Sequence, residues 1–177
     1  MRFTTTPRRS ILAAAALLSL GLTGSASAAT TTATVTVTGG SLSISVPPDA
    51  GSLGTKANTV LAGTISGPLG AVTVNDARSA AAGSGWVASV ISTAFTPPSG
   101  PTIGAAAVSY AAGPITKVGT ATFTANDPSD LTGVSPAVTA TGITGDNSAT
   151  WNPTITVTVA GGKAAGVYSG TITHSVV

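Results

Sequence analysis

Apolar and polar residues alternate with period two along much of this chain. In residues 34–38 two valines alternate with three threonines, and residues 41–46 repeat the pattern with leucine, isoleucine and valine. Residues 119–125 and 154–159 alternate in the same way. Each segment therefore has one apolar face and one face of hydroxyl or other small side chains. This pattern predicts antiparallel strands with one face buried and the other in water.

Turn-forming residues separate these segments at regular intervals. They are Gly39-Gly40, Pro47-Pro48-Asp49, Gly67-Pro68, Pro97 to Gly100, Gly113-Pro114, Asn126-Asp127-Pro128 and Gly161-Gly162. The spacing predicts about nine strands in an all-β, antiparallel two-sheet β-sandwich, immunoglobulin-like or jelly-roll-like, with a closed barrel as the alternative. Residues 76–83 lack helical periodicity and are expected to form a turn or loop. The predicted core comprises Val35, Val37, Leu42, Ile44, Phe123, Trp151, Ile155, Val157 and Ile172.

The N-terminus has the organisation of a signal peptide. Arg2, Arg8 and Arg9 precede an apolar run over residues 11–22, and Ala26-Ser27-Ala28 follows it. We predict a signal peptide over residues 1–28, cleaved after Ala28, and a single domain over residues 29–177. The apolar run is shorter than the about 20 residues that span a bilayer, which favours removal over anchoring. The arginine pair leaves a twin-arginine export route open beside the general secretory one.

Charge and composition narrow the range of partners. Cleavage would remove three of the seven basic residues and leave four against five aspartates, a net charge of −1. Without a basic cluster, nucleic acid is not an expected partner. No second apolar stretch is long enough to span a membrane. Glutamate and cysteine are absent, so few charges protect the strand edges from pairing with another molecule.

Two regions resemble the WxL domain, a surface module of Gram-positive bacteria. The first centres on residues 85–90, Gly-Trp-Val-Ala-Ser-Val, and the second covers residues 168–176 at the end of the chain. Ala88 stands where the family has leucine, and His174-Ser175-Val176 stands where it has a second Trp-x-Leu. The resemblance covers roughly residues 35–177. It implies a β-sandwich that associates non-covalently with the peptidoglycan of the cell wall, often beside other surface proteins.

Three residues of these regions are candidates for ligand binding: Trp86, Tyr168 and His174. Trp86 and His174 each have a structural alternative. Apolar residues lie on both faces of the segment around Trp86, which favours packing in a central strand. His174 shares parity with apolar neighbours, which favours a partly buried, hydrogen-bonded side chain. Trp151 is expected to be a core residue, with a carbohydrate-stacking platform as the alternative.

Catalytic patterns are not recognisable in the sequence. A single histidine without cysteine cannot build a multi-histidine metal site, and no nucleophile motif accompanies the serines. Asp127 and Asp130 lie too close in sequence to flank a sugar as paired carboxylates. Calcium binding is their functional alternative, and capping of their own turn is favoured. We therefore expect neither an enzyme nor a cofactor.

These observations together predict a secreted, non-enzymatic cell-surface protein. Its expected partner is peptidoglycan or another cell-wall polymer, bound non-covalently, with other surface proteins as possible neighbours. The alternative is a structural subunit that assembles with itself through strand edges into a surface layer or fibre.

Overall fold

The computed structural model describes residues 31–177, and the predicted signal peptide lies outside them. The chain divides into two units, one ending at Thr36 and the other formed by Val37–Val177. Residues 31–36 carry no regular secondary structure and are exposed. All strands belong to the second unit.

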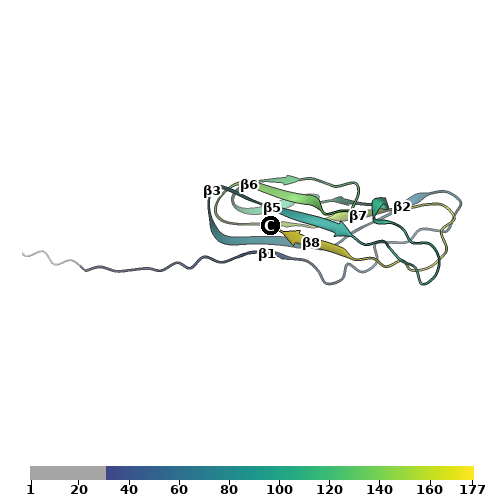
Figure 1. The fold of residues 1–177 in the computed structure, drawn as a ribbon, viewed down its shortest axis with the longest axis horizontal. Coiled ribbons are helices and arrows are strands. Elements are labelled where there is room, and N and C mark those ends of the chain that lie inside the picture. Colours follow the sequence, from purple (N-terminus) through teal and green to yellow (C-terminus); the bar gives the residue numbers. More distant parts are fainter. Residues whose placement is uncertain (1–30) are drawn as a thin grey trace, which may run out of the picture. The chain divides into compact units, whose positions relative to one another are not determined.

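The second unit is a sandwich of two antiparallel sheets (Figure 1). Its strands are β1 (Leu42–Ser45), β2 (Gly63–Pro68), β3 (Val72–Ser92), β4 (Val108–Ala111), β5 (Ile115–Ala125), β6 (Ser135–Trp151), β7 (Thr154–Val159) and β8 (Ile172–Val176), with one short 3₁₀ helix, η1 (Ala105–Ala107). One sheet has the order β1-β3-β6-β5, with β8 also paired to β3, and the other has the order β2-β7-β4. The predicted all-β, two-sheet fold is confirmed. Within residues 31–177, no helix has the length and apolar character needed to cross a membrane.

Two long strands, β3 and β6, organise the larger sheet. They pair with each other from end to end, with register shifts between Asp76 and Trp86 and another between Ala88 and Ser89. The first part of β3 also pairs with β1 and the last part with β8. Figure 1 shows β3 curving round at one end of the sandwich. Because of this bend, Trp86 from the second half of β3 reaches Asn147, which lies opposite Asp76 of the first half.

The bend corrects the prediction for residues 76–83. The sequence pattern predicts a turn or loop for this segment, but it lies inside β3. The sequence has no apolar alternation there because side chains such as Ser79 are exposed at the curve. Backbone pairing, including Ala80 opposite Gly145, maintains the strand here, although most side chains of the segment are not buried.

The predicted strand at residues 34–38 is also corrected. The structure assigns no strand before Leu42 among its described residues, and Val35 and Val37 are 90% and 85% exposed rather than in the core. Alternation identifies a segment that suits a strand, but a strand also needs a neighbouring backbone to pair with. Gly40 is the first residue with such a bond, from its N–H to the carbonyl of Ala77 at 2.6 Å.

The core lies between the two sheets and inside the bend. Its largest fully buried side chains include Trp86, Trp151 and Tyr110. Of the predicted core residues, Trp151, Ile155 and Val157 are buried, as expected. The remaining ones outside the N-terminal segment are partly buried against the same core: Leu42, Ile44, Phe123 and Ile172.

Candidate functional site

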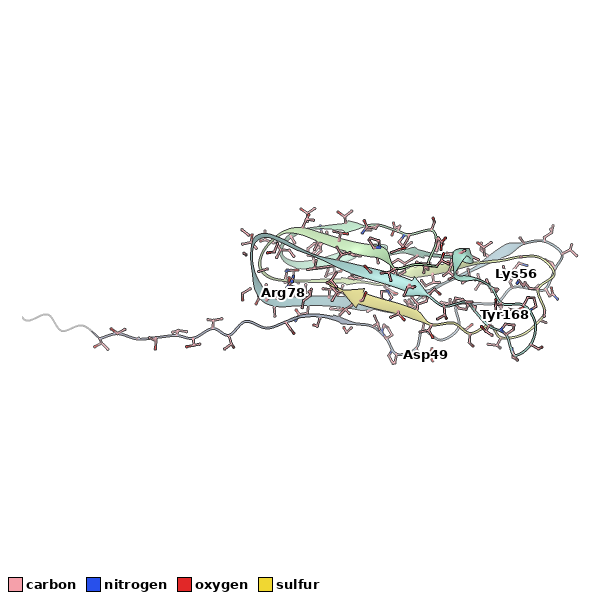
Figure 2. All side chains as sticks on the ribbon, viewed as in Figure 1. Asp49, Lys56, Arg78 and Tyr168 are labelled. Carbon is pink, nitrogen blue, oxygen red and sulfur yellow. The ribbon has the colours of Figure 1, made fainter. Side chains whose placement is uncertain are left out.

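A groove of about 790 Å³ opens between two long loops. One loop, residues 46–59, follows β1, and the other, residues 160–171, precedes β8. Figure 2 shows Asp49, Lys56 and Tyr168 in this part of the domain, away from Arg78. The volume lies within the range of about 300–1,000 Å³ that is usual for ligand pockets. Apolar side chains line the groove: Leu53 from the first loop, and Ile65, Leu69, Phe95, Ile103, Val157, Val159 and Ile172 from outside the two loops.

Tyr168 forms part of one wall and is held in place by its own loop. Its hydroxyl donates to the carbonyl of Ala164 at 2.9 Å. The next residue, Ser169, exchanges two backbone hydrogen bonds with Thr96, at 2.8 and 3.0 Å. The loop is therefore fixed to the segment that carries Phe95, and the half-buried Tyr168 ring lines the groove.

Lys56 braces the opposite loop. Its ammonium group donates to three oxygens of the same loop region: Ala57 O, Thr59 Oγ1 and Leu61 O, at 3.3, 3.4 and 3.1 Å. An ammonium group has three protons. All three are thus engaged by the protein, so Lys56 stabilises the loop more than it offers a charge to a ligand.

His174 lies on β8 and contributes to the groove lining from below. Its Nε2 is 3.2 Å from the hydroxyl of Tyr110, which in turn accepts a hydrogen bond from the indole N–H of Trp151 at 2.7 Å. Burial lowers the pKa of His174 to about 4, so the ring is neutral at pH 7. The Tyr110 proton is then free to donate to Nε2, and Nδ1 is buried without a hydrogen-bond partner among the described residues.

Trp86, the third predicted binding residue, lies in the core instead. It is only 2% exposed, and its indole N–H donates to Asn147 Oδ1 at 2.9 Å. The groove lining includes Tyr168 and His174 but not Trp86. The structure therefore brings two of the three candidates together and separates the third, because the bend of β3 turns Trp86 inward.

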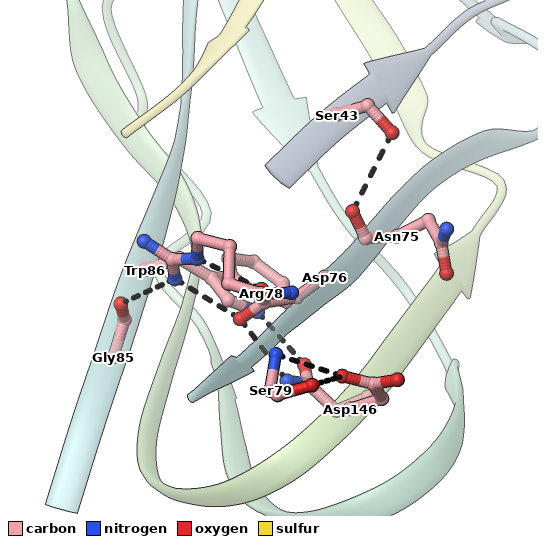
Figure 3. A network of polar contacts seen from close by, with 9 residues as sticks. Ser43, Asn75, Asp76, Arg78, Ser79, Gly85, Trp86 and Asp146 are labelled. Atoms are coloured by element: carbon pink, nitrogen blue, oxygen red, sulfur yellow. Dashed lines mark hydrogen bonds and ion pairs between the residues drawn. The ribbon is translucent and has the colours of Figure 1, made fainter. Parts of the chain in front are cut away.

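Trp86 belongs to a polar network that sequence reasoning missed (Figure 3). The buried carboxylate of Asp76 accepts from Arg78 Nε at 2.8 Å, from Arg78 Nη2 at 3.0 Å and from Asn147 Nδ2 at 3.2 Å. The hydrogen bonds from Arg78 hold the pKa of Asp76 below its usual range, against the effect of burial. Asp76 and Arg78 have the spacing of same-side residues in a strand. That spacing is the one signal in the sequence that could have identified the pair, and it is hidden where the segment is interpreted as a loop.

Asp127 and Asp130 both bond to backbone groups. Asp130 caps its own turn, accepting from the N–H of Thr132 at 2.7 Å and from its hydroxyl, as the turn-capping interpretation predicts. Asp127 instead accepts from the N–H of Ala112 at 2.7 Å and ties its turn to the end of β4. Both carboxylates thus have structural partners in the described chain.

The groove lining contains one carboxylate and one histidine among its described residues. Among its described lining residues, Asp49 is the one carboxylate, and it accepts from the N–H of Gly51 at 2.8 Å. His174 is neutral and is bonded to Tyr110, without a carboxylate to orient it. Hydrolysis of a glycosidic bond normally uses two carboxyl groups on either side of the substrate.

The chain matches no protein-family model, no curated protein and no solved structure. The resemblance to the WxL domain therefore remains a prediction from the sequence.

Proposed function

We propose that this protein is a secreted, non-enzymatic surface protein that binds peptidoglycan of the cell wall in the groove between residues 46–59 and 160–171. The observation that carries the proposal is the half-buried Tyr168 ring beside an apolar floor. Sugar rings have apolar faces that pack against aromatic rings. Side-chain hydroxyls of the same groove are suited to the sugar hydroxyls: Ser52, Thr55, Thr59, Ser169 and Thr171.

Non-covalent binding without hydrolysis fits the chemistry of the lining. A single carboxylate, already bonded to Gly51, does not provide the acid and base that a glycosidase needs. The resemblance of residues 35–177 to the WxL domain supports the same class of partner. Localisation at the cell surface follows from this proposal together with the predicted signal peptide.

Sedimentation of the exported protein with purified Gram-positive peptidoglycan tests the proposal. We expect the wild type to sediment with the wall material. Tyr168→Phe keeps the ring and should retain binding, whereas Tyr168→Ala removes it and should weaken binding roughly threefold to tenfold. Circular dichroism of each variant checks that the fold is intact.

Two results would contradict this account in different ways. A folded wild type that stays in the supernatant would reject peptidoglycan as the partner. Wild-type binding that a folded Tyr168→Ala variant retains in full would place the contact outside the groove.

A further inference from the structure

Residues 34–38 have the sequence of a strand and lie outside every strand of the described structure. Val35 and Val37 are almost fully exposed, and they alternate with three threonines. β-branched residues favour extended backbone. The segment is therefore suited to pair with a sheet edge, and pairing would bury two valines that water now surrounds.

The outer edge of β5 offers such a place. β5 is the last strand of the five-stranded sheet, with β6 on its inner side. Among residues 31–177, no backbone hydrogen bond from another segment reaches its outer side. A free edge of this kind is a template for an added strand.

The side chains of β5 match those of residues 34–38. Ala121 and Phe123 are partly buried against the core, while Thr120, Thr122 and Thr124 are exposed. The Phe123 ring packs at 5.7 Å from the ring of Trp86, and the ammonium group of Lys117 lies 5.9 Å from the Phe123 ring centroid. An added strand would place its valines beside Ala121 and Phe123 and its threonines beside the threonines of β5.

We propose that residues 34–38 of one molecule pair with the outer edge of β5 of a second copy of this chain. The valines would extend the sandwich core past Phe123, and aromatic pairs with β-branched residues stabilise neighbouring strands. The proposal is independent of wall binding, because β5 contributes no residue to the groove lining.

Chain length favours pairing with a second copy over pairing within one molecule. Gly40 is fixed beside β3 by its bond to Ala77. In the order β1-β3-β6-β5, a strand added outside β5 would lie four strand positions from β1. At about 4.8 Å per strand this is about 19 Å along the sheet. Thr38 lies only two residues before Gly40, a reach of about 7 Å.

Each molecule would carry one donor segment and one acceptor edge. Such a head-to-tail contact generates open chains of molecules unless the rotation between neighbouring copies closes a ring. A five-residue strand makes a small interface. Assembly should therefore be reversible and depend on protein concentration.

Cysteine trapping tests the contact directly, because the sequence contains no cysteine. Exported Thr36→Cys protein is mixed with exported Thr122→Cys protein under mild oxidation, and Thr34→Cys and Thr38→Cys cover the neighbouring registers. We expect a disulfide-linked dimer, since trapping requires Cα atoms within about 7 Å. Ser43→Cys, which is exposed on β1 at the opposite edge of the sheet, is the control acceptor and should trap little.

Analytical ultracentrifugation of the unmodified chain provides the second measurement. Val35→Thr combined with Val37→Thr keeps the β-branched shape but removes the apolar face, and should weaken association about tenfold. Thr34→Ser combined with Thr36→Ser is the matched control and should change it little. Three results would overturn the proposal: a wild type that stays monomeric at high concentration, equal trapping by Ser43→Cys, or a Thr36→Cys/Thr122→Cys chain that closes its disulfide within one molecule.

Discussion

Asn147 is the residue that joins the two halves of the bent sheet. Its side chain accepts from the indole N–H of Trp86 and donates to the carboxylate of Asp76, and all three residues are buried. Buried polar groups without partners are costly, and here a single side chain satisfies two of them. The stability of the bend therefore depends on one amide.

We predict that Asn147→Ala lowers the free energy of unfolding by about 2–4 kcal/mol, because both a buried N–H and a buried carboxylate oxygen lose a partner. Chemical denaturation measures the change. The exposed neighbour Asn75 provides the control, and Asn75→Ala should change stability by less than about 0.5 kcal/mol. Equal effects of the two substitutions would mean that the network contributes nothing specific.

His174 predicts a pH dependence with a defined direction. Burial lowers its pKa from 6.5 to about 4, so the unfolded chain binds a proton more readily than the folded one. Stability should be constant above the unfolded pKa and should fall as the pH drops from about 6.5 towards 4. The lowered pKa of Asp76 affects stability chiefly below its ordinary value of 3.8. Most of the change between about pH 6.5 and 4.5 should therefore come from His174.

Urea unfolding at several pH values between 7 and 4.5 measures this slope. His174→Gln retains a polar side chain without a titrating ring and should flatten the profile in that window. A variant whose slope equals that of the wild type would assign the pH dependence to another group.

The sequence predicts the burial of a single residue correctly where only one face of its strand is apolar. Trp151 shares its parity with Ile155 and Val157, and all three are buried. It is less informative for Trp86, which has apolar neighbours on both faces, and its partner Asn147 lies 61 residues away along the chain. Contacts of that kind depend on the bend, which no local pattern predicts.

At the scale of elements, alternation of apolar and polar residues identifies those strands that are straight and have one face exposed to solvent. β1, β7 and the part of β5 that follows its register shifts, residues 122–125, are of this kind. The long strands β3 and β6 are not recognisable as continuous from the sequence, since their patterns break where they curve. The loops of the groove carry no periodic signal at all, and their closure depends on tertiary bonds such as that between Thr96 and Ser169.

The path of β5 beside β6 depends on Gly119. Its φ is +88°, and a Cβ at this position would lie 2.5 Å from the carbonyl oxygen of Asp146 on β6. Gly142 also has a positive φ, +63°, but a Cβ added there would meet no atom within 4 Å beyond its own chain neighbours. Substitution of Gly142 therefore tests backbone strain alone, whereas substitution of Gly119 tests backbone strain together with steric overlap.

We predict that Gly142→Ala costs about 1–2 kcal/mol, the strain of a side chain at positive φ. Gly119→Ala should cost about 1–3 kcal/mol more, because β5 must also shift away from β6. Thermal unfolding of the two variants measures the difference. Equal losses would show that β5 moves without resistance at this point.

At the scale of the whole molecule, the chain has little charge with which to bind a polymer. After the predicted cleavage, four basic residues face five aspartates. In the groove, the protons of Lys56 are engaged by its own loop, and the ammonium group of Lys163 donates to the carbonyl of Thr102 at 2.6 Å. Any contact with a wall polymer should therefore rest on rings and hydroxyls.

We predict that binding to peptidoglycan changes less than about twofold between about 50 mM and 500 mM salt, because few charges are present for salt to screen. Lys163→Gln should leave binding unchanged for the same reason, whereas Tyr168→Ala should weaken it at every salt concentration. Sedimentation with wall material free of anionic polymers, and with the untreated material, measures both effects. Binding that falls steeply with salt and requires Lys163 would instead indicate that the groove recognises an anionic cell-wall polymer through its lysines. The Tyr168 ring would then line the site without being its principal contact.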